Sequence, residues 1–155
     1  MALKSNFNFD RSMRGLQKQV DGIYDRIINS FIYAGETFIK NARGQVQDHA
    51  MGTYVDQTTN LRNSIGYFIF HDGRYVTGKN DLASNTIEIQ DHVKPKGIQL
   101  IGIAGMNYAS EVESKGYNVI SYQADVCIVE IAMYLGKLGV VEGGTAARLE
   151  ESFIP

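Results

Sequence analysis

Cysteine occurs only once in this sequence of 155 residues, at position 127. An internal disulfide is therefore excluded, which is typical of a protein that folds in a reducing compartment. Histidine is also scarce, and no two of His49, His71 and His92 have the close spacing of zinc ligands. We therefore expect no metal site, and we expect Cys127 to be a core residue.

Long apolar runs are lacking as well. The first ten residues contain no apolar core of signal-peptide length. The longest apolar run, residues 126–141, is interrupted by Glu130 and Lys137 and is too short to span a bilayer. We expect a soluble protein that makes no contact with a membrane.

Motifs for nucleotide binding and nucleophilic catalysis are missing too. The chain has neither a Gly-x-Gly-x-x-Gly nor a Gly-x-x-x-x-Gly-Lys-Ser/Thr sequence, and Ser64 and Ser110 lack a Gly-x-Ser-x-Gly context. Glu111 and Glu113 are two residues apart on an expected helix, so they point in different directions and do not form a natural acid–base pair. We predict a protein that is not an enzyme and that binds no cofactor.

A surplus of positive charge is lacking, since the net charge is −2. This argues against a dedicated nucleic-acid-binding protein, which usually carries a basic patch. The charge is nevertheless uneven, with +2 over residues 1–50, 0 over residues 51–110 and −4 over residues 111–155. Ends of opposite sign suit a head-to-tail contact between identical subunits, and a chance distribution is the alternative.

Two helices are predicted within a single domain that covers residues 1–155. Apolar residues at spacings of three and four predict a long helix over residues 11–43, capped by Asp10 and preceded by an extended arm of about residues 1–9. At about 50 Å this helix should overhang a small domain, and the overhang is a candidate subunit contact. A second helix over residues 122–138 is apolar nearly all round, so we expect it to be buried on more than one side. One side can pack on the sheet, and the other needs either the long helix or another subunit. A tail of about residues 140–155 follows.

Strands are predicted between the two helices. Side chains alternate over residues 65–70, and Asp72-Gly73 supplies a tight turn for a β-hairpin covered on both faces. Residues 98–104 are the candidate central strand, residues 86–90 a short edge strand and residues 117–120 a further strand. The expected fold class is α+β, with a long N-terminal helix and a second buried helix packed on a mostly antiparallel β-sheet.

Two stretches resemble a known family. The run Asp-Gln-Thr-Thr-Asn-Leu-Arg-Asn-Ser-Ile-Gly-Tyr at residues 56–67 resembles the Thr-Gly-x-Leu-Arg-x-Ser-Ile signature of the tail-completion and neck proteins of tailed bacteriophages. Residues 108–116 resemble the same family's Tyr-Ala-x-x-Val-Glu-x-Gly signature. The signature residues are Thr58, Leu61, Arg62, Ser64, Ile65, Tyr108, Ala109, Val112, Glu113 and Gly116.

The resemblance implies a structural protein of the virion, made in the host cytoplasm. It would form a homo-oligomeric ring of six or twelve copies at the head–tail junction, as a tail-completion, neck or tail-terminator protein. Its partners would be other junction or tail proteins, and DNA would pass with at most non-specific contact. The resemblance also implies a structural role for Glu113, which bonds backbone amides or pairs with a basic residue such as Arg62; an isolated solvated carboxylate is the alternative.

Two other functions are open from the sequence alone. One is a small non-viral α+β domain that binds or converts a ligand between its sheet and its helices, which would need a convergent polar cluster. The other is a regulatory dimer with residues 126–138 as the dimer seam.

Overall fold

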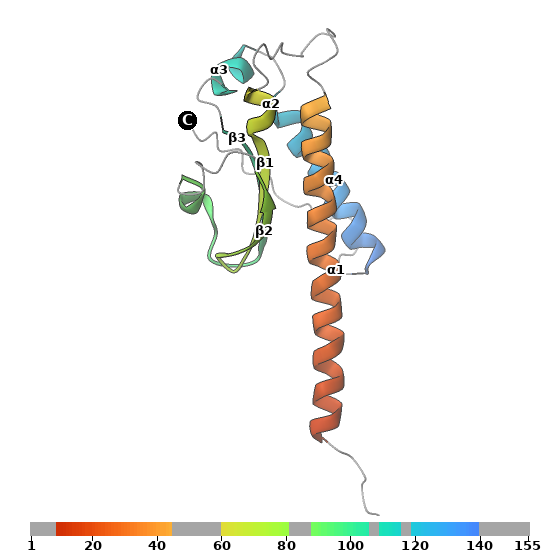
Figure 1. Cartoon of the computed structure of the whole chain (residues 1–155). Coiled ribbons are helices and arrows are strands. Elements are labelled where there is room, and N and C mark those ends of the chain that lie inside the picture. Colours follow the sequence, from red (N-terminus) through yellow and green to blue (C-terminus); the bar gives the residue numbers. More distant parts are fainter. Residues whose placement is uncertain (1–8, 45–59, 81–87, 106–108, 116–118, 140–155) are drawn as a thin grey trace, which may run out of the picture.

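The computed structural model describes residues 9–44, 60–80, 88–105, 109–115 and 119–139 (Figure 1). The expected α+β fold is confirmed. Its elements in chain order are α1 (Phe9–Gly44), α2 (Asn60–Ser64), β1 (Ile65–His71), β2 (Arg74–Lys79), the 3-10 helix η3 (Glu88–His92), β3 (Ile98–Ala104), α3 (Ala109–Ser114) and α4 (Ser121–Lys137).

The sheet has three strands in the order β2-β1-β3, and both pairs are antiparallel. The predicted hairpin turn is confirmed, since Asp72 and Gly73 both have positive φ, at 49° and 76°. The Asp72 amide donates to the carbonyl of Gly97 at 2.9 Å, and the Gly97 amide donates to Asp72 Oδ1 at 2.8 Å. These two bonds attach the turn to the chain that enters β3.

The prediction of residues 98–104 as the central strand is wrong. Within the described sheet, β1 is the central strand and β3 lies beside it at one edge. Six of the seven residues of β1 are buried, whereas only Ile103 is fully buried in β3. The continuous apolar sequence of a strand therefore does not by itself decide its place in the sheet.

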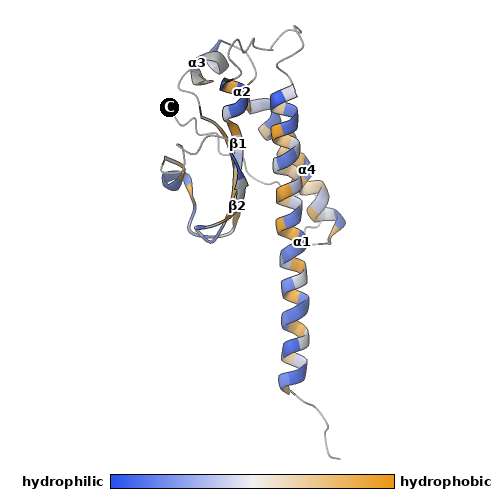
Figure 2. Ribbon diagram, in the orientation of Figure 1, coloured by the Kyte–Doolittle hydropathy of each residue, from blue (hydrophilic) through white to orange (hydrophobic). Residues whose placement is uncertain are grey.

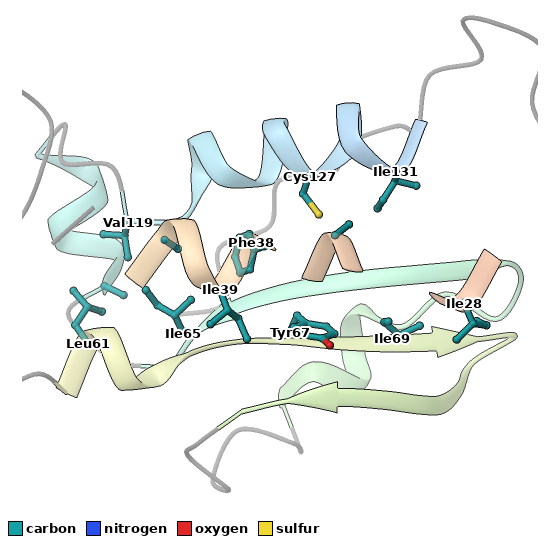
Figure 3. Close-up of a cluster of buried hydrophobic side chains, with 13 residues drawn as sticks. Ile28, Phe38, Ile39, Leu61, Ile65, Tyr67, Ile69, Val119, Cys127 and Ile131 are labelled. Carbon is teal, nitrogen blue, oxygen red and sulfur yellow. The ribbon is translucent and has the colours of Figure 1, made fainter. Parts of the chain in front are cut away.

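Both faces of β1 are covered, as the sequence predicts. Ile65, Tyr67 and Ile69 belong to the main core cluster on the side of α1 (Figure 3). Phe68 and Phe70 face the other side, where they form a second cluster that includes Ile89 of η3.

Helix α1 is the middle layer of the fold, between the sheet and α4 (Figures 1 and 3). On one side it lies so close to the sheet that a Cβ added to Gly35 would be 2.5 Å from the ring of Tyr67. On the other side it meets Cys127 and Ile131 of α4, which belong to the same core cluster. The expected contact of the second helix with the long helix is therefore confirmed, whereas its expected contact with the sheet is wrong, because α1 occupies that face.

Three local expectations are corrected. Asp10 lies inside the first turn of α1 and not at a cap position before the helix. There its negative charge interacts favourably with the helix dipole. The expected strand at residues 86–90 is replaced by η3, which lets Ile89 reach the second core cluster. Val119 and Ile120 form a bend before α4 and not a strand, although Val119 is buried in the core.

The predicted overhang of the long helix is confirmed. The ring of Tyr24 contacts the ring of His71 in a tilted arrangement with centroids 4.9 Å apart, and the first buried residue of α1 is Ile28. The part before Tyr24, residues 9–23, extends past the sheet and past α4 (Figure 1). We call these residues the overhang, which is about 20 Å long at 1.5 Å per residue.

Among the helices that the structure describes, none combines the length and the apolarity required to cross a membrane.

Candidate assembly surfaces

The signature residues that the structure describes lie mainly in the core, at the end of the domain where α2 meets β1. Leu61 and Ile65 are buried and share a cluster with Ala109 and Val119. The Ser64 hydroxyl is fully buried and donates to the carbonyl of Leu61 at 2.7 Å, which closes the single turn of α2. These residues set the angle at which the chain enters the central strand.

Two further contacts hold this junction in place. Arg43 Nη2, near the end of α1, donates to the carbonyl of Ile65 at 2.9 Å and to that of Asn63 at 3.5 Å. The Gly105 amide, just after β3, donates to the carbonyl of Ser64 at 3.2 Å. The junction therefore connects α1, the sheet and α2, and its residues serve the fold.

The other signature residues are placed only in part. Arg62 of α2 is half-buried. Thr58, Tyr108 and Gly116 lie outside the described residues. Val112 and Glu113 lie in α3, but their side chains are outside the described part, so both roles considered for Glu113 stay predictions.

Ionisable side chains in the described residues do not converge on one point. Glu36 accepts from Lys79 Nζ at 2.8 Å and from the Tyr67 hydroxyl at 3.2 Å, at the α1–β2 edge of the sheet. Burial, assisted by Glu36, raises the pKa of Tyr67 to about 12. Burial, assisted by Glu130, raises the pKa of the Cys127 thiol to about 12, so this thiol is neutral at physiological pH. No group of three metal-binding side chains occurs in the part of the chain that the structure describes.

Apolar side chains on the overhang form the first notable surface. Their spacing along the helix alternates between four and three residues, which places them on one side of it (Figure 2). They are between 48% and 64% exposed, which is far above the exposure of the core residues on the same helix. We call them the overhang stripe, and its members are Phe9, Met13, Leu16, Val20 and Ile23.

A second apolar stripe lies on the outside of α4. Tyr122, Val126, Val129 and Met133 also follow a spacing of four, three and four, and Tyr122, Val129 and Met133 are 55–59% exposed. At 3.6 residues per turn, these four lie opposite the buried residues Gln123, Cys127 and Ile131. We call them the outer α4 stripe. The outward side of a surface helix is usually polar, so this side of α4 has the composition of a contact surface.

The sequence names residues 126–138 as a candidate dimer seam, but it does not identify which row of this helix is exposed. The helix is apolar nearly all round, which predicts burial on several sides. In the structure only one side is buried, because α1 is its main partner. The alternation of four and three residues was the available signal, since it divides the apolar residues of α4 into an inner and an outer row.

Comparisons of the chain with protein-family models, with curated proteins and with solved structures found no match.

Proposed function

We propose that this protein is a structural component of the virion of a tailed bacteriophage. In this proposal its copies form a ring of six or twelve at the head–tail junction, as a tail-completion, neck or tail-terminator protein. The mechanism is geometric: each subunit offers one surface to the next, a constant rotation closes the ring, and DNA passes through without sequence readout. Catalysis, cofactors and membranes have no part in it.

The two apolar stripes are the observation that carries this proposal. Together they leave eight large apolar side chains at 48–64% exposure on a chain of 155 residues. Contiguous apolar surface of this kind marks sites of protein association. The resemblance of residues 56–67 and 108–116 to the phage family signature supplies the viral setting.

The oligomeric state of the purified full chain tests the proposal. We expect a closed species of at least six copies by mass photometry, with rings and a central channel in negative-stain electron micrographs. A chain that remains monomeric up to millimolar concentration in light scattering would contradict it.

A regulatory dimer is the second candidate, because the outer α4 stripe is also suited to a two-fold helix pair. In a symmetric dimer both copies use the same surface, so association stops at two chains. A species of two copies at every concentration would favour the dimer over the ring.

A further inference from the structure

We propose that the overhang of one copy packs on the outer α4 stripe of the next copy, in a head-to-tail contact. The inference rests on the proposed ring and names the two surfaces that would form it. Both surfaces are rows of apolar side chains on helices, and all of these side chains except Val126 are at least 48% exposed.

The two stripes match in repeat and in length. Each alternates between spacings of four and three residues, which is the pattern of side chains that interlock between two adjacent helices. The overhang stripe extends about 21 Å and the outer α4 stripe about 17 Å along their helices. A helix carrying either stripe is therefore a suitable partner for the other.

One chain cannot satisfy both stripes by itself. Helix α1 is a single unbroken helix from Phe9 to Gly44, and its second half is fixed between the sheet and α4. The overhang thus points away from the body, while the outer α4 stripe faces away from α1 on the body (Figure 1). A second copy is needed to bring the two together.

Charge favours the head-to-tail contact over a pair of identical helices. The overhang has a net charge of +1, from Arg11, Arg14 and Lys18 against Asp10 and Asp21. Helix α4 has a net charge of −1, from Asp125 and Glu130 against Lys137. Opposite signs meet in the head-to-tail contact, whereas two overhangs or two α4 helices would bring like charges together.

The second reason to favour the head-to-tail contact is that it covers both stripes with one kind of contact. A symmetric pair of overhangs would leave the outer α4 stripe in water, and a symmetric pair of α4 helices would leave the overhang stripe in water. The head-to-tail contact covers both stripes in every interior copy. Because it joins two different surfaces it repeats from copy to copy, and a constant rotation that sums to a full turn closes it into the proposed ring.

Two double variants of the full chain test the contact. Leu16→Gln/Val20→Gln blocks the overhang stripe, and Val129→Gln/Met133→Gln blocks the outer α4 stripe. Val129 and Met133 lie on the folded body, and Leu16 and Val20 lie on the overhang. All four side chains are exposed, so circular dichroism and thermal unfolding of the dilute variants should match wild type. The matched control is Lys18→Gln/Asp21→Gln, which places the same residue on the overhang away from its stripe and keeps the net charge of the overhang at +1.

Sedimentation equilibrium supplies the readout. We expect each blocked variant alone to associate at least 100-fold more weakly than wild type, while the control associates to the wild-type size. An equimolar mixture of the two blocked variants should give a dimer of twice the 17.2 kDa chain mass and nothing larger, because only one intact surface of each kind remains.

Four results would overturn the inference, and they separate it from the proposed function. Rings that persist in both blocked variants would reject this contact and leave the ring intact. Association of the α4-blocked variant alone, with none in the overhang-blocked variant, would indicate a symmetric pair of overhangs. A monomeric wild-type chain would reject both the contact and the ring. Association that appears only after deletion of residues 140–155 would show that the chain's own C-terminal residues cover a stripe.

Discussion

Single residues set how closely the layers of this protein approach each other. Gly35 of α1 and Gly102 of β3 lie where the helix meets the sheet, and a Cβ at either position would be within 2.7 Å of an aromatic ring. At Gly35 that ring is Tyr67, whose hydroxyl is held by Glu36. The ring therefore cannot move away without losing a hydrogen bond and part of its burial.

We predict that Gly35→Ala destabilises the protein by about 1–3 kcal/mol, because overpacking costs more than the gain in helix propensity. The control is Gly22→Ala on the same helix, where an added Cβ meets nothing within 4 Å. It should stabilise the helix by about 0.5–1 kcal/mol. Urea unfolding of both variants checks the opposite signs, and equal effects would contradict this account of the α1–sheet contact.

The buried thiol of Cys127 is the basis of a second prediction for a single residue. Burial, assisted by Glu130, raises its pKa from 9.0 to about 12 in the folded state. A raised pKa contributes stability that is complete below pH 9 and is lost as the pH rises toward 12. We expect unfolding free energy to fall over this window, and to fall less in Cys127→Ala.

Thiol labelling offers an independent check of the same residue. The thiolate fraction at pH 8 should be about 10³-fold lower in the folded chain than in the unfolded chain. Labelling with a thiol reagent should therefore be slow in buffer and fast in urea. Fast labelling of the folded chain would show that Cys127 is accessible.

At the scale of elements, helix α1 has two halves with different environments. The half from Ile28 onward is buried between the sheet and α4, and the overhang is exposed. The spacing of apolar residues alone describes both halves as one apolar stripe. The two halves therefore share a sequence pattern but contribute unequally to the free energy of unfolding of the monomeric chain.

Leucine-to-alanine substitutions measure this difference. Leu61 of α2 is 1% exposed and Leu16 of the overhang is 55% exposed. We expect Leu61→Ala to lower the unfolding free energy by about 2–5 kcal/mol. Leu16→Ala should change it by less than about 0.5 kcal/mol when measured at concentrations where the chain is monomeric. Similar losses at the two positions would contradict the exposure of the overhang.

The elements that sequence reasoning predicted correctly are those specified by neighbours in the chain. The spacing of apolar residues fixed both helices to within a few residues, and Asp72-Gly73 identified the hairpin. Strand order was not predictable, because it depends on which distant strands pair with β1. The environment of α4 was wrong for the same reason, since nothing near it in the sequence shows that α1 occupies the face of the sheet.

The candidate surfaces were predicted in part. The length of the first helix indicated an overhang, which is confirmed, whereas the outer α4 stripe became visible only once the buried side of that helix was known.

At the scale of the whole molecule, association through the two stripes should behave as an apolar contact. We expect sodium chloride between 0.05 and 0.5 M to change the association constant only slightly, because screening acts on the few flanking charges and not on the stripes. Cooling should weaken association, since hydrophobic stabilisation decreases at low temperature. Analytical ultracentrifugation over both series checks this, and a steep loss of association with salt would instead indicate a contact dominated by ion pairs.

The continuity of α1 gives the molecule the mechanical properties of a lever. A helix of 36 residues is about 54 Å long, and more than half of it is clamped between two layers of the body while its free end projects outward. A force on the tip at Phe9 becomes a torque on the clamped part, and that part touches both the central strand and α4. A displacement of the overhang is therefore transmitted to the opposite side of the same domain without any hinge within the helix.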